Sequence, residues 1–278
     1  MRTILRVLCA AAGVGLAWPV ANAAAQQRPP VGDVILATTT SFRDTGLLDS
    51  LLPEFERATG YRVRAVAVGS GQALRMGERG DADVLLVHSP SAEEAFMRSG
   101  AGTRRRVVAY NFFALVGPVG DPARVAAAPT AAAALQAIGV VRAPFVSRGD
   151  SSGTHIRELA LWAQGGGRPS WRGYEETGQG MAATLLVADE RHAYTLTDRA
   201  SLAVLARRID LVDLRPPEPA LLNVYHVIEV SAEARPRVSA SGARAFAEWI
   251  TSDPVQDLID RFGPPGSRLF VAARGREP

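Results

Sequence analysis

Short apolar runs alternate with segments of helical spacing along this chain, and this alternation restricts the fold more than any other feature of the sequence. The run Val34 to Ala37 is typical of a buried strand, and the apolar residues from Leu47 to Phe55 follow with a helical period. Further along we expect a strand at residues 61–67, a helix at 72–79 and a strand at 84–87. Units of this β-α-β-α-β kind form parallel sheets with right-handed crossovers, so the sequence predicts an α/β fold.

A second set of alternating segments begins at Tyr110. We predict strands at residues 110–117, 144–147 and 193–196, and helices at 131–141, 154–164, 182–191 and 198–207. A strand at 221–230, a helix at 243–250 continued to residue 262, and a strand around Leu269 close the chain. We interpret this tail as a return to the first set.

Two doubly wound lobes, linked by two crossing strands that act as a hinge, follow from this interpretation. The crossings would lie near residues 110–118 and 221–230. The first lobe would comprise residues 26–113 and 226–278, and the second lobe residues 114–225. A chain of 278 residues has room for two modest lobes, because single cores stop growing near ~250 to 300 residues.

The first 25 residues have the pattern of a secretory signal peptide. Arg2 and Arg6 precede an apolar run, and Ala21-Asn22-Ala23 or Ala23-Ala24-Ala25 offers small residues for cleavage. The run is shorter than the ~20 residues that span a bilayer, which disfavours a membrane anchor. Cys9, the only cysteine, would leave with the signal. We therefore predict an exported protein without disulfides or thiol ligands.

The charge pattern argues against nucleic-acid binding. The formal net charge of +3 falls to +1 once Arg2 and Arg6 leave with the signal. We expect Arg104-Arg105-Arg106 to form a solvated loop, because no basic stripe or aromatic interleaving extends this run. The chain contains no lysine, so the use of arginine at a given site says nothing about bidentate recognition.

Small polar residues stand directly before several predicted helices. The segments are Thr38 to Ser41, Gly69 to Gly71, Ser147 to Thr154, Gly178 to Gly180, and Thr197-Asp198. Each helix start leaves about four backbone N–H groups without intrahelical partners and carries a partial positive charge. In open α/β sheets, ligands bind outside the carboxyl ends of the strands, where these segments would lie. The recurrence predicts a site for a small anion.

The segment Val146 to His155 concentrates the relevant chemistry. Its glycines would let the backbone approach a ligand, its hydroxyls would donate hydrogen bonds, and Arg148 would offset part of a dianion's charge. Alternatively, Ser151, Ser152 and Thr154 only cap the helix and Arg148 pairs with Asp150. For this segment alone both interpretations stay open, and the recurrence of such segments favours the anion site.

Catalytic and metal sites have weaker support. Ser152, His155 and Asp150 could be drawn as a hydrolase triad, but three residues at one helix start cannot face one another as nucleophile, base and orienter. The four histidines, His88, His155, His192 and His226, have no metal-ligand spacing. The tripeptide Arg148-Gly149-Asp150 is too short to indicate cell adhesion.

Seven blocks of sequence stand in order within the stretch from about Val34 to Val230. They are VILATTTS with DTGLL (34–41 and 44–48), AVGSGQAL (67–74), GDADVLLVH (80–88), FVSRGD (145–150), SGTH (152–155), GQGM (178–181) and AYTLTDR (193–199). Together they resemble the TupA-type tungstate-binding proteins, the periplasmic components of tungstate ABC importers. Seven ordered blocks are far more specific than any one of them.

The resemblance implies a two-lobed periplasmic binding protein of the type II class that closes on a tetrahedral oxyanion, with no enzymatic activity and no cofactor. It implies a periplasmic location, tungstate or molybdate as ligand, and an ABC transporter permease in the inner membrane as partner. Carried over residue by residue, the ligand-binding residues would be Thr39, Thr40, Ser41, Ser70, Arg148, Ser152, Gly153 and Thr154. Asp198 and Arg199 are further candidates, which could brace the lobes instead.

The chain departs from the family pattern at a few positions. Ser70 stands where threonine is common, and Ser151 where a second aspartate is common. Loss of a negative charge beside the anion would relax selectivity, which we state as a hypothesis. A snug pocket would reject the smaller sulfate. Tungstate and molybdate are nearly the same size, so only the resemblance favours tungstate. Molybdate or phosphate capture, delivery to a sensory receptor, and an exported serine hydrolase remain as alternatives.

Overall fold

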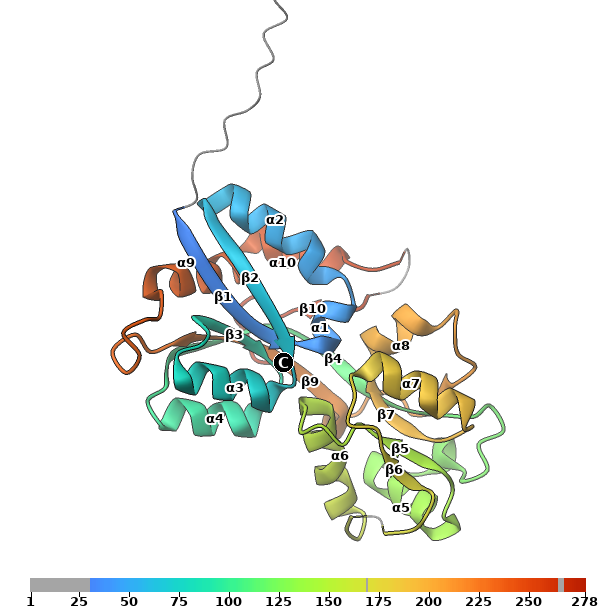
Figure 1. Cartoon of the computed structure of the whole chain (residues 1–278). Coiled ribbons are helices and arrows are strands. Elements are labelled where there is room, and N and C mark those ends of the chain that lie inside the picture. Colours follow the sequence, from blue (N-terminus) through green and yellow to red (C-terminus); the bar gives the residue numbers. More distant parts are fainter. Residues whose placement is uncertain (1–30, 169, 265–267) are drawn as a thin grey trace, which may run out of the picture.

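Two α/β lobes lie side by side in the computed structural model, which describes residues 31–168, 170–264 and 268–278 (Figure 1). The predicted signal peptide at residues 1–25 lies outside the described residues. The predicted fold class, a two-lobed α/β architecture, is confirmed. No helix in the described ranges is long and apolar enough to cross a membrane.

The sheet of the first lobe has the strand order β10-β4-β9-β3-β1-β2. β1 (Gly32–Thr39) pairs in parallel with β2 (Tyr61–Val68) and with β3 (Val84–Val87). β9 (Leu222–Val230) runs antiparallel to β3 and to β4 (Gly102–Gly117), and β10 (Val271–Ala272) closes the edge. The helices of this lobe are α1 (Thr40–Asp44), α2 (Leu47–Thr59), α3 (Ser70–Arg79), α4 (Pro90–Arg98), α9 (Ala240–Ile250) and α10 (Asp253–Arg261).

Each face of this sheet buries its own hydrophobic cluster, because successive side chains of a strand point to opposite faces. Val34 and Leu36 of β1 pack into a cluster with residues of α2, α9 and α10. Ala37 and Ile35 face the other cluster, which includes residues of α3 and α4. Phe246 of α9 and Ile259 of α10 belong to the first cluster. The C-terminal tail therefore returns to the first lobe, as predicted.

The second lobe is built on the end of β4. Residues Phe113 to Val116 pair antiparallel with β7 (Thr195–Asp198), and the last residues of β4 pair with β8 (Val212–Asp213). β5 (Phe145–Ser147) pairs in parallel with β6 (Tyr174–Glu176) and is bridged to Tyr194. The helices are α5 (Ala131–Val141), α6 (Gly153–Gln164), α7 (Met181–Glu190) and α8 (Arg199–Leu205), with short 3₁₀ turns η1 (Val125–Ala127) and η2 (Pro219–Leu221).

Two antiparallel strands connect the lobes. β4 runs from the first lobe into the second, and β9 returns beside it with Asn111 opposite Asn223 and Phe112 opposite Leu222. Both crossings fall where the sequence predicted them. Leu221 packs in the core of the second lobe and Tyr225 in that of the first. The division at residues 113/114 and 225/226 stays a prediction.

The prediction of a solvated loop at residues 104–106 was wrong, because these arginines belong to β4. Nε of Arg105 lies 2.9 Å from the carboxylate of Glu93 on α4, and Nη2 of Arg106 lies 3.6 Å from that of Glu229 on β9. Carboxylates on a neighbouring helix and a neighbouring strand therefore give the guanidinium groups of Arg105 and Arg106 their partners. A run of like charges can therefore continue a strand.

Candidate functional site

Three of the five polar segments predicted to bind an anion meet between the lobes, those at residues 38–41, 69–71 and 147–154. Thr39 ends β1 and Thr40 begins α1, while Ser70 begins α3 in the same lobe. The second lobe contributes the loop after β5 and the start of α6. Nη2 of Arg148 lies 3.4 Å from Oγ1 of Thr40, which joins the two lobes directly. The strand-end argument from the sequence therefore placed these segments correctly.

Glycines permit the closest approach between the lobes. A methyl group on Gly153, at the start of α6, would lie 2.6 Å from the carbonyl oxygen of His88 and 2.9 Å from its ring. A methyl group on Gly71 would lie 3.3 Å from the carbonyl oxygen of Ser151. Real Cβ atoms do not come within 3 Å of a backbone oxygen, so Gly153 is the position that most directly allows this contact.

The first lobe presents neutral hydroxyl groups to this junction. Oγ1 of Thr39 accepts from the N–H of Phe42 and caps α1, and it lies 3.3 Å from Oγ of Ser41. Ser70 is completely buried, and its Oγ has no hydrogen-bond partner among the described residues. No side chain caps α3, whose first residue is Ser70. Both the hydroxyl and the helix start are therefore free to donate to a ligand.

The second lobe presents the cation. Arg148 is 2% exposed, and its Nη2 lies 2.5 Å from Oδ2 of Asp150. Its Nε has no partner within the described part of the chain. Thr154 is completely buried, and its Oγ1 is likewise unpartnered there. Oγ of Ser152 accepts from the N–H of His155 and caps α6. The capping and anion-binding interpretations therefore apply to different atoms of the same loop.

A tight backbone turn aims Arg148 into the junction. Gly149 has φ +63°, and a methyl group there would lie 2.6 Å from Cβ of Glu176, so only glycine fits without strain. Ser151 also has positive φ, at 56°. The backbone N–H of Ser152 donates to Oδ1 of Asp150, and this hydrogen bond stabilises the turn that follows Arg148.

The unpartnered atoms of this cluster are donors. Leaving a buried donor without an acceptor costs roughly 1–3 kcal/mol, so several at one place indicate a missing partner. They are Ser70 Oγ, Thr154 Oγ1 and Arg148 Nε. A tetrahedral oxyanion offers only acceptors and carries the opposite charge to the guanidinium. The arrangement therefore suits capture of such an anion.

Asp198 and Arg199 do not join this cluster of donors. Asp198 caps α8, with its carboxylate accepting from the N–H and the hydroxyl of Ser201. Arg199 donates to the carbonyl oxygen of Arg215 and pairs with Asp213 at 2.7 Å. Both partners of Arg199 lie in the second lobe, so Arg199 braces that lobe. An ionised carboxylate only accepts hydrogen bonds, so Asp198 has no donor for an anion.

The hydroxyl groups that the first lobe presents, those of Thr39, Ser41 and Ser70, are called the hydroxyl cluster below. A buried histidine, His88, lies next to this cluster, and sequence reasoning did not assign it a role. Nε2 of His88 lies 3.5 Å from Oγ of Ser41, and Nδ1 lies 2.8 Å from Oδ1 of Asn223. The His88 ring stacks on Tyr225 with centroids 4.7 Å apart. Burial lowers the pKa of His88 from its ordinary value. The position of His88 at the end of β3 was the available signal, because the other parallel strands also end in site residues.

A second buried titratable group, the carboxyl of Glu158, stabilises the start of the loop that carries Arg148. Glu158 of α6 accepts hydrogen bonds from Ser147, from the indole of Trp162 and from the hydroxyl of Tyr174. Burial raises the pKa of Glu158 to about 7, although these three hydrogen bonds oppose the shift. Ser147 is the residue before Arg148, so Glu158 fixes the end of β5 from which the loop departs.

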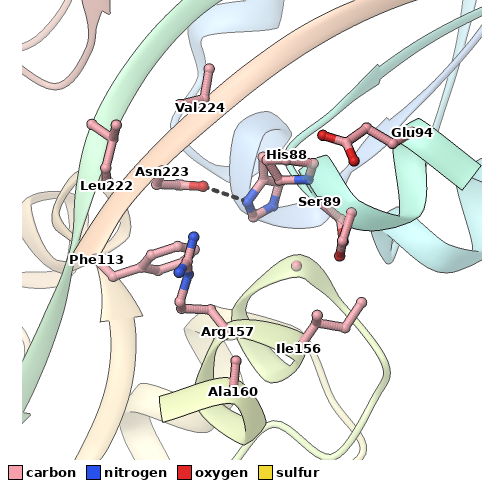
Figure 2. A pocket seen from close by; sticks show the side chains of 13 residues that line it. His88, Ser89, Glu94, Phe113, Ile156, Arg157, Ala160, Leu222, Asn223 and Val224 are labelled. Atoms are coloured by element: carbon pink, nitrogen blue, oxygen red, sulfur yellow. Dashed lines mark hydrogen bonds between the residues drawn. The ribbon is translucent and has the colours of Figure 1, made fainter. Parts of the chain in front are cut away.

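A cavity of about 340 Å³ adjoins the cluster on the side of α4 and α6 (Figure 2). His88 and Gly153 line this cavity and also border the hydroxyl cluster. Figure 2 shows Arg157 of α6 reaching toward Asn223 and Phe113, with Glu94 of α4 on the other side. No group of three or more His, Cys, Asp or Glu residues in the described ranges could hold a metal ion.

Comparisons with known proteins agree with this geometry. Residues 23–254 match the family model of the PBP superfamily domain, the class that the two lobes and the site between them define. A tungstate-binding protein TupA from Peptoclostridium acidaminophilum is 43% identical over 283 residues, which covers 98% of each chain. A TupA from Campylobacter jejuni subsp. jejuni is 38% identical over 235 residues, 82% of this chain and 86% of the relative.

Solved structures give the same result. The tungstate ABC transporter structure from Geobacter sulfurreducens has a TM-score of 0.75 at 42% identity, covering 83% of this chain and 98% of that one. The tungstate binding protein TupA from Desulfovibrio alaskensis G20 has a TM-score of 0.72 at 43% identity, covering 87% and 98%. The chain therefore belongs to the PBP superfamily and, within it, to the family of TupA-type tungstate-binding proteins.

Proposed function

We propose that this protein captures tungstate as a tetrahedral dianion between its two lobes and delivers it to an ABC importer, without catalysing a reaction. The observation that carries the proposal is the convergence of buried, unpartnered donors from both lobes: Ser70 Oγ from one, and Arg148 Nε and Thr154 Oγ1 from the other. The names of the relatives support tungstate as the ligand.

Binding exchanges the anion's water shell for these fixed donors. In a buried site of low effective dielectric, hydrogen bonds to an ion gain strength, and charge-assisted bonds are roughly twice as strong as neutral ones. The carboxylate of Asp150 holds Arg148 in place, so little side-chain freedom is lost on binding. The ligand-binding set of this proposal is Thr39, Thr40, Ser41, Ser70, Arg148, Ser152, Gly153 and Thr154.

The proposed setting is the periplasm. The charged, apolar and small-residue pattern of residues 1–25 supports export, and the relatives whose names include an ABC transporter support a permease as the partner. The bound form, with its lobes closed, would dock on that permease in the inner membrane. The ligand would be the only non-protein group required.

Ligand-dependent thermal unfolding tests the proposal. Protein stripped of bound anion is heated with tungstate, molybdate, sulfate or phosphate. An anion at ~100 times its dissociation constant should stabilise the fold by ~2.7 kcal/mol. We expect a raised midpoint with tungstate at the lowest concentration. A shift with phosphate alone would replace tungstate by phosphate, and no shift with any of the four would remove the capture function.

An exported serine hydrolase is the second candidate, because one arrangement favours it. Oγ of Ser41, the imidazole of His88 and Oδ1 of Asn223 follow one another at 3.5 and 2.8 Å, the order of nucleophile, base and orienter. Ser152 and His155 are not so related, because Nδ1 of His155 accepts from the N–H of Ser151. A fluorophosphonate probe should leave a binding protein unlabelled, and labelling that is lost in Ser41→Ala would favour the hydrolase.

A further inference from the structure

The hydrogen-bond network below the hydroxyl cluster determines which nitrogen of His88 carries a proton. Nδ2 of Asn111 lies 3.4 Å from Oδ1 of Asp198 and 3.4 Å from the carbonyl oxygen of Leu269. A carbonyl oxygen and an ionised carboxylate can only accept, so the amide nitrogen of Asn111 must point to them. The amide oxygen of Asn111 then accepts from Nδ2 of Asn223 at 2.8 Å.

This orientation extends to the imidazole. Because Nδ2 of Asn223 donates to Asn111 and to the hydroxyl of Tyr225, its Oδ1 faces His88. Nδ1 of His88 must therefore carry hydrogen and donate to that oxygen at 2.8 Å. In a neutral imidazole the other nitrogen, Nε2, then holds a lone pair and accepts.

The neutral form of His88 is poorly matched to an anion. The group next to Nε2 is the hydroxyl of Ser41, at 3.5 Å, and this hydroxyl has one hydrogen to donate. If Ser41 donates to His88, its oxygen lone pairs are left for the ligand. If His88 is protonated, Nε2 becomes a donor to Ser41, and the hydrogen of Ser41 is free to bond an oxyanion.

The charges around His88 also favour its protonation when an anion binds. Burial is the main cause of the lowered pKa of His88, and the charge of Arg148 acts in the same direction, whereas the charges of Asp198, at the start of α8, and Glu93, on α4, oppose it. Arg157 and Glu94 line the cavity beside the ring. Arg148 is already paired with Asp150 at 2.5 Å. A buried dianion would add two negative charges to this environment, and His88 is the group in contact with Ser41 that can gain a positive charge.

We propose that capture of the dianion is coupled to the uptake of one proton from solvent by His88, which changes His88 from an acceptor to a donor toward Ser41. No bond of the anion forms or breaks, and no electron is transferred. This inference rests on the proposed capture of a tetrahedral dianion, and it adds a proton to the bound complex.

The sign of the pH dependence follows from linkage. Burial lowers the pKa of His88 in the ligand-free protein, and a nearby dianion would raise it in the complex because opposite charges favour the protonated form. Between these two pKa values the complex holds more protons than the free protein. Affinity therefore falls by up to ~10-fold for each unit of rising pH in that interval, and it becomes independent of pH above it.

Titration calorimetry of the ligand-free protein with sodium tungstate tests this inference. At about pH 7.5, near the ordinary histidine range, the heat is measured in Pipes and in Tris, buffers with small and large ionisation enthalpies. The difference gives the number of protons taken up. We expect a net uptake approaching one proton per tungstate, and a value of zero in a complex that does form would overturn the inference.

Substitutions assign the proton. The amide of His88→Gln can take the place of Nε2 but does not titrate, so this variant should bind tungstate with no proton uptake and a flat pH profile. His192→Asn is the matched control, because His192 is exposed and has φ +48°, which asparagine tolerates; it should behave as the parent. Uptake that persists in His88→Gln, or that disappears in His155→Gln, would overturn the assignment.

Two further outcomes keep the inference separate from the proposed function. If the parent protein gives no binding heat with tungstate and no thermal shift, the capture function fails, and with it the inference that rests on it. If His88→Gln does not fold by circular dichroism, proton uptake by the parent and the slope of its affinity between about pH 6.5 and about pH 8.5 decide the question.

Discussion

The two walls of the site recognise an anion in different ways. The wall from the first lobe presents neutral hydroxyls, among them Ser41 and Ser70, and the direction of the Ser41 hydrogen depends on His88. The wall from the second lobe presents a buried guanidinium, that of Arg148, which Asp150 holds in place. One wall is adjustable and uncharged, and the other is charged and preset. We therefore expect changes in the second lobe to cost more affinity, and changes in the first to alter pH dependence and fine selectivity.

The largest effect is expected from removing the cation. Arg148→Ala should weaken tungstate binding by about 100-fold, because a hydrogen bond to a charged group contributes about 1.5–3 kcal/mol and Asp150 would be left facing the anion. Calorimetry measures the change, and circular dichroism checks the fold. Arg191→Ala is the control, because Arg191 is exposed and pairs with Glu175 away from the site. Equal affinities of parent and Arg148→Ala would place the guanidinium outside the complex.

A methyl group at the contact between the lobes should be nearly as harmful. Gly153→Ala puts a Cβ 2.6 Å from the carbonyl oxygen of His88, so the walls must separate, and we expect a loss of at least ~10-fold in affinity. Alanine favours the helix, so the thermal midpoint without ligand should not fall. Gly139→Ala in α5, where the nearest atom is 3.6 Å away, should bind as the parent does. Unchanged binding by Gly153→Ala would show that the lobes need not approach this closely.

The unpartnered hydroxyls should show opposite effects on stability and on binding. Ser70→Ala and Thr154→Val each remove a buried group that has no protein partner in the described residues, so the ligand-free protein should be as stable as the parent or more stable. Each should lose about 1 kcal/mol of binding free energy, or about 5-fold in affinity.

The control for these variants is a serine with a partner. Oγ of Ser239 caps α9 far from the site, so Ser239→Ala should lose about 1 kcal/mol of stability and keep its affinity. If Ser70→Ala and Thr154→Val instead destabilise the ligand-free protein as Ser239→Ala does, these hydroxyls stabilise the fold and are not ligand-binding groups.

Glu158, which fixes the end of β5 before Arg148, should make the stability of the protein depend on pH, because burial raises the pKa of this carboxyl to about 7. The folded protein then binds this proton more tightly than the unfolded chain, whose carboxyl titrates near 4.5. The contribution of Glu158 to stability is therefore greatest below about pH 4.5 and decreases as the pH rises to about 7.

Glu158→Gln should flatten this profile. Relative to the parent, its unfolding free energy should rise by on the order of 2 kcal/mol between about pH 5 and about pH 8, as measured by denaturant unfolding. Glu190→Gln, at an exposed position of α7, should follow the parent at every pH. Parallel profiles for Glu158→Gln and the parent would mean that Glu158 is ionised in the folded protein throughout this range.

The smallest effect is expected at Ser151, where the family commonly has an aspartate. The side chain is exposed, so an added charge is screened by solvent, and Ser151→Asp should change affinity ratios only by about 2- to 5-fold. We expect stronger discrimination among tungstate, molybdate and sulfate in the variant, measured by competition. Identical ratios in the two proteins would contradict the hypothesis that serine relaxes selectivity.

The same contrast between the walls explains what the sequence could predict. Local patterns indicated the strand ends and helix starts, so the segments that contain Thr39, Ser70 and Arg148 were found from spacing and residue type, and the resemblance to the family singled out the individual residues. His88 was not, because its role depends on Asn223 and Asn111, which come from two crossing strands distant in sequence. Partners brought together by tertiary structure leave no periodic signal along the chain.

Two other positions depend on tertiary partners in the same way. The arginines at 104–106 could occupy β4 because Glu93 and Glu229 lie on neighbouring elements, a pairing that no local pattern shows. Arg199 follows a strand end like the other candidates, yet Asp213 and the carbonyl oxygen of Arg215 hold it within the second lobe. Spacing can place a side chain at the right edge of a sheet, but its direction depends on its partners.

A crystal structure of the tungstate complex tests most directly whether both lobes bind the same anion. Tungsten scatters strongly and anomalously, so its position is read from the diffraction data without assumption about the protein. We predict a single tungsten site between the lobes, with oxygen atoms within hydrogen-bonding distance of Ser70 Oγ, Thr154 Oγ1 and Arg148 Nε. A tungsten site elsewhere, or one bound by a single lobe while these three atoms stay unpartnered, would contradict it.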